Sequence, residues 1–378
     1  MAISCKMSGR QAGSRNRIIR GIPISTVAAP REINARPRNL FSGIISSVES
    51  TMSERLLSAA IRVLERVPTP LLAAVLEILF CLAWALDRRH RRYARINLGI
   101  AFPGIADREA RRIIFRMYRG MGTGLAELIR MPRMGRRYLE SHIRIEGAEH
   151  LEKSRAGTGL GCILMTGHFG NWELFAHALS LLLEPISVVA RSRDSGALDR
   201  VITARRKLSG NRVIRRDRAA RAILTALRAK THVGVLIDQD VPAGKGVFAP
   251  LFGVEASTTD GIARLALSTG ANIHPAFIHR DPERKFRHVL RFGPAIPMDG
   301  SADRESEVAA LTARCNGALE RAIRVGPSDW MWIHRRWKTR PPGQESPYPA
   351  RKGRASATTP RKDREAEDPV ASSGRGAA

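Results

Sequence analysis

Cysteine is scarce in this sequence, with only Cys5, Cys81, Cys162 and Cys315 among 378 residues. The four lie far apart and show neither the density of a disulfide-stabilised domain nor the short spacings of a zinc site. Their arrangement argues against a disulfide scaffold and against a cysteine-based metal site. It is typical of a protein from a reducing compartment.

Acidic residues are also few, with 35 Asp and Glu against 63 Lys and Arg, for a formal net charge of +28. Residues 1–50 carry eight basic residues against two acids, and residues 341–378 carry seven against five, so most of the excess lies between these ends. Such a charge favours nucleic acid or an anionic membrane surface as a partner. Zinc-finger spacings and aromatic RNA-binding motifs are missing, so we expect no nucleic acid. Anionic lipids and a phosphorylated glycolipid fit the charge.

Long hydrophobic runs are limited to one segment. Residues 53–67 show the apolar periodicity of an amphipathic helix, which Pro68 and Pro70 end. Residues 71–86 are then mostly apolar, with Glu77 as their one acid, and basic residues 88–92 follow. A 16-residue helix is about 24 Å long, shorter than the roughly 30 Å hydrocarbon core of a bilayer. We predict a membrane anchor or a helix dipped into one leaflet, with a buried core helix as the alternative.

Strands and helices alternate from about residue 143 to residue 290, which predicts an α/β fold with a mixed sheet flanked by helices. We expect strands at 143–147, 160–165, 186–191, 212–215, 232–238, 272–280 and 287–292, and helices at 108–130, 198–208, 218–230, 262–269 and 305–325, with a polar loop at 238–246 that leads to residues 247–253. Ligands bind such sheets at the carboxyl ends of their strands. This rule places His168, Arg191 and Asp238 along one edge.

The segment from Ile163 to Glu173 combines a short apolar run, two glycines and a helix-forming sequence. We predict a strand, a tight turn that holds His168, and a helix with Glu173 in its first turn. The turn would let the carboxylate accept the imidazole N–H, and a neutral, oriented imidazole is suited to take a proton from an alcohol. The alternative is a histidine that caps the helix and a surface glutamate.

Several motifs occur in a fixed order along the chain. They are His168-Phe-Gly-Asn-Trp-Glu173, Asp238-Gln-Asp240, Phe252-Gly253, Thr258-Thr259 and the segment Trp330 to Arg340. Together they resemble the bacterial lipid A biosynthesis acyltransferase family, the lauroyl/myristoyl branch of the lysophospholipid acyltransferase superfamily, from about residue 97 to residue 341. The resemblance implies a glycerolipid acyltransferase-like fold and transfer of an acyl chain from an acyl carrier protein or coenzyme A thioester to a hydroxyl of a lipid A precursor. It also implies no cofactor and a location on the cytoplasmic face of the inner membrane.

The resemblance also suggests roles for single residues. His168 would be the base and Glu173 its orienting partner in the His-x4-Glu motif. Arg206 matches the essential arginine of the family and would contact a phosphate or the donor's pantetheine arm. Asp238 matches the first acid of the Asp-x-Asp element and would hold an arginine in place.

Other residues keep two interpretations. Arg191 and Arg280 lie at strand ends and would bind anionic groups, or they are surface charges. Glu127 is either a structural partner or an exposed helix charge. We expect no metal site, because the sequence offers no compact set of ligands. The last segment offers Trp330, Trp332 and Trp337 for a membrane interface or for core packing.

The resemblance divides the chain into residues 52–96 as membrane-associated helices, residues 97–341 as the acyltransferase domain and residues 342–378 as a disordered tail. Residues 1–50 have no apolar region of the secretory type and resemble a transit peptide in composition. Because the family is bacterial, we expect translation to start at Met52 and residues 1–51 to be a disordered or mis-assigned extension. The alternative functions are acylation of another glycolipid, such as a mannosylated phosphatidylinositol, or of a lysophospholipid. A non-catalytic basic membrane-binding protein is a further alternative.

Overall fold

The computed structural model describes residues 57–190, 197–215, 219–300 and 303–349. Within them a seven-stranded sheet has the order β1-β9-β8-β2-β5-β3-β4. Its strands are β1 (Ile143–Glu146), β2 (Ile163–Thr166), β3 (Ser187–Ala190), β4 (Arg212–Arg215), β5 (Val233–Leu236), β8 (Ile273–Arg280) and β9 (His288–Phe292). The β8–β9 pair is antiparallel, whereas the other pairs in this sheet are parallel. The predicted mixed sheet and α/β class are confirmed.

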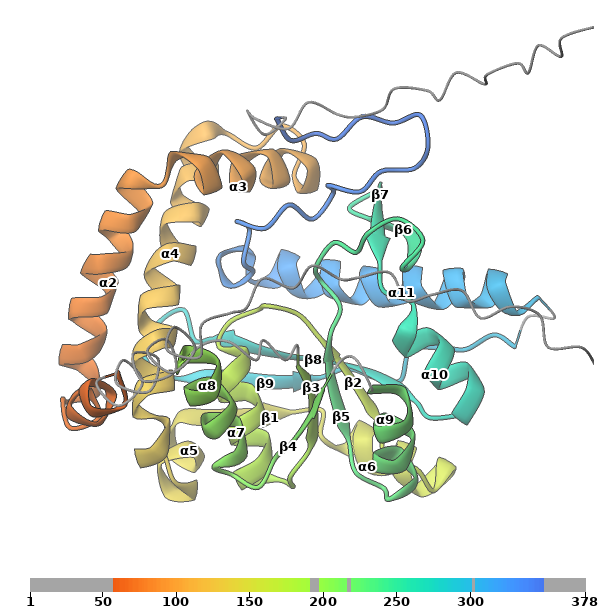
Figure 1. Cartoon of the computed structure of the whole chain (residues 1–378), viewed down its shortest axis with the longest axis horizontal. Helices are drawn as coiled ribbons and strands as arrows, with labels where there is room; N and C mark the ends of the chain where they lie inside the picture. Colours follow the sequence, from red (N-terminus) through yellow and green to blue (C-terminus); the bar gives the residue numbers. More distant parts are fainter. Residues whose placement is uncertain (1–56, 191–196, 216–218, 301–302, 350–378) are drawn as a thin grey trace, which may run out of the picture. The chain divides into compact units, whose positions relative to one another are not determined.

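Helices cover both faces of this sheet (Figure 1). They are α2 (Thr69–Leu86), α3 (Arg88–Ala101), α4 (Asp107–Arg130), α5 (Arg136–His142), α6 (Glu149–Thr158), α7 (Trp172–Leu182), α8 (Ala197–Lys207), α9 (Ala219–Arg228), α10 (Gly261–Thr269) and α11 (Arg304–Val325). Alternate residues of β2 face opposite layers. Ile163 and Met165 pack with residues of α10 and α11, whereas Leu164 packs with residues of α7. A buried parallel strand has this two-sided apolar character because helices cover both of its faces.

Five elements were missing from the sequence-based prediction: helices α3, α5 and α6 and strands β6 (Val247–Leu251) and β7 (Val254–Thr258). Helix α3 begins with a run of basic residues, and α5 and α6 are short segments of mixed charge. Strand β7 pairs with β6 in an antiparallel hairpin whose turn places Phe252 and Gly253 at positive φ. The hairpin packs against α11, so tertiary contact stabilises a segment for which the sequence predicted only the end of a polar loop and the start of a helix.

Helix α2 lies along α4 and exposes most of its apolar side chains (Figure 1). Glu77 faces α4, where its carboxylate binds Arg119 at 2.9 Å, Thr123 at 2.7 Å and Lys285 at 2.8 Å. Only 17% of the helix is buried, which contradicts the alternative of a buried core helix. Among the described helices, α2 alone is long and apolar enough to cross a membrane, judged by length and composition.

The C-terminal segment belongs to the core. Trp330, Trp332 and Trp337 are fully buried, so the membrane-interface interpretation of these three residues is wrong. Tyr348 is buried as well, and its hydroxyl donates to Asn97 Oδ1 on α3 at 2.5 Å. The prediction of a disordered tail is therefore wrong for residues 342–349, because this tyrosine anchors the segment. Residues 1–51 and 350–378, for which disorder was also predicted, lie outside the described residues.

Candidate active site

His168 and Asp238 meet at the carboxyl edge of the sheet because their strands are parallel neighbours in register. Thr166, the last residue of β2, pairs with Leu236, the last residue of β5. His168 and Asp238 each follow two residues later, and His168 Nδ1 lies 2.8 Å from Asp238 Oδ1. The backbone N–H of His168 also donates to Asp238 Oδ2 at 2.7 Å.

The carboxylate of Asp238 determines the tautomer of His168. An ionised carboxylate only accepts hydrogen bonds, so His168 Nδ1 carries the proton and the neutral ring has its lone pair on Nε2. Burial alone would raise the pKa of Asp238. The adjacent His168 imidazole and the hydrogen bonds that the carboxylate accepts outweigh this effect, so the pKa lies well below its usual range. Trp330 Nε1 supplies one of these bonds, at 2.9 Å from Oδ2. Asp238 is therefore ionised, fully buried and fixed in position.

Glu173 does not orient His168, which corrects the predicted pairing. Helix α7 begins at Trp172, and in its first turn Glu173 faces Arg206 of α8. Arg206 Nε donates to one carboxylate oxygen at 2.8 Å, and its Nη2 donates to the other at 2.5 Å. Trp172 Nε1 also donates to the Glu173 carboxylate, at 3.2 Å. A guanidinium that donates two hydrogen bonds to a carboxylate binds it more strongly than a neutral imidazole does.

The expected role of Asp238 is corrected at the same time. We had predicted that this acid holds an arginine, yet it holds the histidine, and Glu173 holds the arginine. Burial lowers the pKa of Arg206, but the hydrogen bonds and charge of Glu173 outweigh this effect and raise the pKa. The ion pair is therefore charged at neutral pH.

The turn that holds His168 is tightly constrained. Gly170 has φ +57°, and a Cβ there would lie 2.0 Å from the carbonyl oxygen of Ile278. A Cβ on Gly167 would lie about 3 Å from the Asp238 carboxyl group. On the other side, the backbone N–H of Met331 donates to the His168 carbonyl oxygen at 3.1 Å. Glycine is required at position 170 because any side chain would clash with backbone.

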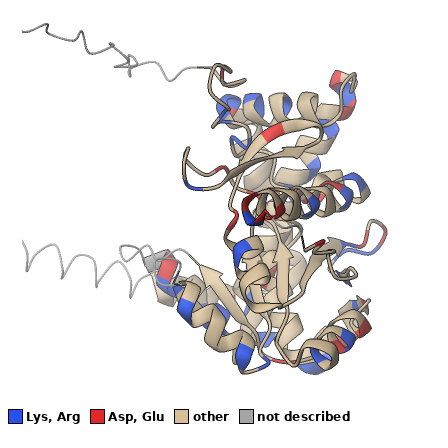
Figure 2. Cartoon of the chain, turned by 90° about the vertical axis from the view of Figure 1, so that its right-hand side faces the viewer, with Lys and Arg blue, Asp and Glu red and all other residues tan. Residues whose placement is uncertain are grey.

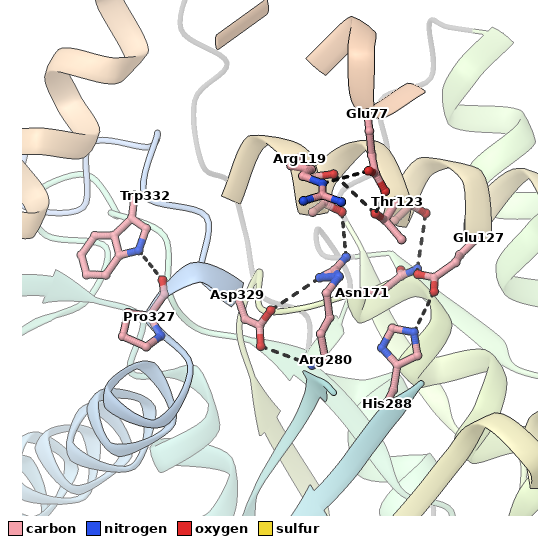
Figure 3. Close-up of polar contacts among 12 residues, drawn as sticks. Glu77, Arg119, Thr123, Glu127, Asn171, Arg280, His288, Pro327, Asp329 and Trp332 are labelled. Carbon is pink, nitrogen blue, oxygen red and sulfur yellow. Dashed lines mark hydrogen bonds and ion pairs between the residues drawn. The ribbon is translucent and has the colours of Figure 1, made fainter. Parts of the chain in front are cut away.

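A buried polar chain fixes the start of α7 (Figure 3). Asn171 caps this helix through Oδ1, which accepts from the backbone N–H of Leu174, while its Nδ2 donates to Glu127 at 2.8 Å. The other Glu127 oxygen accepts from His288 Nε2 at 2.7 Å. Burial raises the pKa of Glu127, but the nearby His288 and Arg280 charges and these bonds lower it overall. Of the two interpretations of Glu127, the structure supports the structural partner.

His168 lines a cavity of about 1040 Å³ at the edge of the sheet. Its walls combine apolar residues from three strands and the following loops with basic residues from α8 and β4. The apolar members are Val189, Val213, Val235, Leu236, Ile237 and Val241, and the basic members are Arg200, Arg206, Lys207 and Arg215. The cavity therefore offers an apolar surface and a cationic surface beside the imidazole, which suits a lipid with an anionic group.

The other predicted site residues are Arg191, Arg206 and Arg280, and they do not all lie at the cavity. Arg206 lines the cavity as expected. Arg280 is not among the lining residues, and its guanidinium donates to the Gly120 carbonyl oxygen at 2.8 Å and lies 3.6 Å from Asp329. Arg191 lies outside the described residues. Within the part of the chain that the structure describes, no three potential metal ligands come together.

Sequence reasoning missed the partnership of His168 with Asp238 and Trp330. One signal was available, because His168 and Asp238 lie at the carboxyl ends of the strands predicted at 160–165 and 232–238, which the sequence analysis placed along one edge. Two neighbouring parallel strands of that kind bring their next residues together at one edge. The strand order, which makes β2 and β5 neighbours, was not readable from a single sequence.

Comparison with known proteins identifies the family. Residues 48–339 match the family model described as bacterial lipid A biosynthesis acyltransferase. The lipid A biosynthesis lauroyltransferase of Escherichia coli K12 is 30% identical over 270 residues, which cover 71% of this chain and 85% of that protein. The lipid A biosynthesis palmitoleoyltransferase of the same strain is 28% identical over 289 residues, which cover 75% of this chain and 90% of that protein.

Among solved structures, the 1-acyl-sn-glycerophosphate acyltransferase of Thermotoga maritima matches 68% of this chain and 99% of its own. The identity is 16% and the TM-score is 0.33, which is too low to support an argument about the fold. The sequence comparisons are decisive, because the family model covers well over half of the residues. The chain belongs to the bacterial lipid A biosynthesis acyltransferase family and is an acyltransferase.

Proposed function

We propose that this enzyme transfers a fatty acyl chain from an acyl carrier protein or coenzyme A thioester to a hydroxyl group of a lipid A precursor, with His168 as the general base. One observation carries the proposal: Asp238 Oδ1 lies 2.8 Å from His168 Nδ1, so the basic nitrogen is Nε2, in a ring that lines a large cavity. Histidine is the commonest side chain for this task.

The reaction needs no acyl-enzyme intermediate because the thioester is already activated. His168 Nε2 takes the proton of the acceptor hydroxyl as its oxygen attacks the thioester carbonyl carbon. When the tetrahedral intermediate collapses, the C–S bond breaks and the imidazolium returns a proton to the thiolate. Asp238 remains ionised throughout and stabilises the imidazolium, as the aspartate of a catalytic triad does.

Glu173 has a positioning role in this proposal. Its carboxylate holds the Arg206 guanidinium at the cavity wall, where a guanidinium binds phosphate with two parallel hydrogen bonds. Arg206 would thus hold an anionic group of the acceptor or of the donor. Arg200, Lys207 and Arg215 line the same cavity and add positive charge. The apolar strand residues supply a surface for an acyl chain.

The membrane supplies the acceptor in this account, and α2 supports attachment to the cytoplasmic face of the inner membrane. The helix is apolar and mostly exposed, and the arginines of α3 follow it directly. Basic residues next to an apolar helix stay on the cytoplasmic side and attract anionic lipids.

Purified full-length chain tests the proposal in detergent solution, with acyl carrier protein and coenzyme A thioesters offered separately to a lipid A precursor and to a lysophospholipid. We expect acylated lipid A precursor from at least one donor, and we expect His168→Ala to lower turnover about 10²- to 10⁴-fold. His150→Ala is a matched control, because this partly exposed histidine of α6 does not line the cavity. Acylation of the lysophospholipid alone would refute the proposed acceptor, and full turnover by His168→Ala would refute the proposed base.

A further inference from the structure

Four arginines of α3 share one face of the helix. Arg88, Arg91, Arg92 and Arg95 follow the spacing i, i+3, i+4, i+7, which places side chains side by side along a helix. The opposite face is buried in the core, through Tyr93, Ala94, Asn97, Leu98 and Ala101. Packing of that face fixes the rotation of α3, so the arginines point outward together.

These arginines line a second cavity, of about 360 Å³, which shares no lining residue with the cavity at His168. Arg111 of α4 adds a fifth guanidinium, and Trp84 and Ile114 are the two other lining residues. None of the lining residues is acidic. Figure 2 shows that Lys and Arg of the described residues lie largely on the outer helices, and this cavity is where five of them converge.

The positive charge in this arginine pocket is poorly neutralised. Asp107 lies 3.7 Å from Arg95 and 3.5 Å from Arg111, and these are long, solvent-exposed ion pairs. Arg91 stacks over the Trp84 ring, 5.0 Å from its centroid. Arg88 and Arg92 form no ion pair with any residue that the structure describes. Like charges held this close repel one another, so a bound anion would stabilise the pocket.

The exposed apolar face of α2 ends at Leu86, two residues before Arg88. Leu82 and Leu86, in the last turns of α2, are 55% and 82% exposed, and Leu71, Val75, Ile78 and Leu79 extend the same exposed stripe. Trp84 lies on the opposite side of α2 from this stripe, where it contacts Phe115 of α4 and lines the pocket. A membrane with anionic headgroups offers a partner for both the arginines and the apolar stripe.

We propose that the arginine pocket binds the phosphate of an anionic phospholipid in the membrane that the exposed apolar face of α2 contacts. Guanidinium groups bind phosphate oxygens in pairs, and five of them surround this cavity. The site is separate from the His168 cavity and does not depend on the acyl-transfer chemistry, so binding is measurable without turnover. It would hold the enzyme at a fixed depth and orientation on the membrane.

Vesicle flotation of the full-length chain tests this site. The probes are vesicles of phosphatidylcholine alone and of phosphatidylcholine mixed with phosphatidylglycerol. A basic residue near an anionic surface contributes about a factor of five to binding, so Arg88→Gln/Arg92→Gln is expected to weaken binding to the anionic vesicles roughly thirtyfold. The matched control is Arg221→Gln/Arg228→Gln on α9, which removes the same charge from two exposed arginines outside the pocket.

A third variant separates a phosphate site from general attraction to charge. Arg88→Lys/Arg92→Lys keeps the charge but removes the paired hydrogen bonds, and we expect a clear loss of binding from it as well. Equal effects of the α3 and α9 variants, or unchanged binding of the α3 variant, would overturn the proposal. Normal vesicle binding by the α3 variant together with a raised KM for the glycolipid acceptor would also overturn the proposal. The pocket would then hold the phosphate of the acceptor. Thermal melting of each variant verifies that the chain is folded.

Discussion

Asp238 determines which nitrogen of His168 is available for chemistry. Its oxygens accept from the ring Nδ1, from the His168 backbone N–H and from Trp330, so each hydrogen bond that fixes the carboxylate also fixes the imidazole. This dependence makes Asp238 the residue whose substitution is most informative after His168 itself.

We expect Asp238→Asn to lower kcat by about 10²- to 10⁴-fold with little change in KM, because an amide at this position favours the wrong tautomer of His168. Asp240→Asn is the control. Asp240 lies two residues along the same loop and accepts from the backbone and the hydroxyl of Thr339, without a contact to His168. Steady-state kinetics on both variants checks the prediction, and comparable kcat values for the two would contradict it.

A second prediction concerns the buried His279, whose ring contacts Phe169 in the turn that holds His168. Burial, with a contribution from Arg291, lowers the pKa of His279 from 6.5 to about 4. Between these values the unfolded chain binds a proton that the native chain does not, so the stability from neutral His279 is present above pH 6.5 and lost as pH falls toward 4. The loss is about 3 kcal/mol over this window, at about 1.4 kcal/mol per pH unit.

Urea unfolding followed by tryptophan fluorescence at several pH values measures this effect. His279→Gln has no titrating group, so its free energy of unfolding should fall less steeply between pH 6.5 and 4.5 than that of the parent chain. Carboxyl groups titrate in both proteins and cancel in the comparison. Parallel curves for the two proteins would show that His279 does not titrate as described.

At the scale of elements, the contact between α2 and α4 depends on one glycine. A Cβ on Gly122 would lie 2.8 Å from the backbone of Glu77, so the two helices approach as closely as their backbones allow. The buried carboxylate of Glu77 forms its ion pairs with the more exposed Arg119 and Lys285 at the same level. This contact fixes the apolar face of α2 relative to the acyltransferase domain.

Gly122→Ala should therefore destabilise the protein by about 1–3 kcal/mol, since the added methyl group forces the helices apart. Gly99→Ala makes the same change in α3, where no atom lies within 4 Å of the added Cβ. The higher helix propensity of alanine should stabilise that variant by up to about 1 kcal/mol. Thermal melting tests both, and a Gly122→Ala variant as stable as the parent would show that α2 does not pack against α4 as described.

The elements that sequence analysis found have an apolar pattern or a boundary that is visible without tertiary contacts, and the missed elements do not. Strand β4 and helix α4 carry strong apolar periodicity or a clean boundary, and they were predicted within a residue or two. Helix α3 was missed because its outer face is a run of arginines, and its apolar residues are visible as one face only once α4 packs on them. Strand β7 was missed because its pairing with β6 and its packing on α11 are tertiary effects.

At the scale of the whole molecule, the sequence pointed to four residues that the structure brings into two pairs, but it did not predict the pairs, and Arg280 lies away from the cavity. His168, Glu173, Arg206 and Asp238 lie close together as expected. The two acids nevertheless exchange partners, because pairing depends on strand order and on where α8 lies beside α7. Such side-chain pairs depend on how segments that are distant in the sequence are placed relative to one another. The spacing of motifs along the chain does not encode this placement.

The most direct test of the central claim is lipid mass spectrometry of a host strain that produces the full-length chain, the His168→Ala variant or the His150→Ala variant. We predict a lipid A species heavier by one acyl chain in the strains with the parent chain and His150→Ala, and its loss with His168→Ala. The same species at the same level with His168→Ala would contradict the role of His168 as the base of acyl transfer.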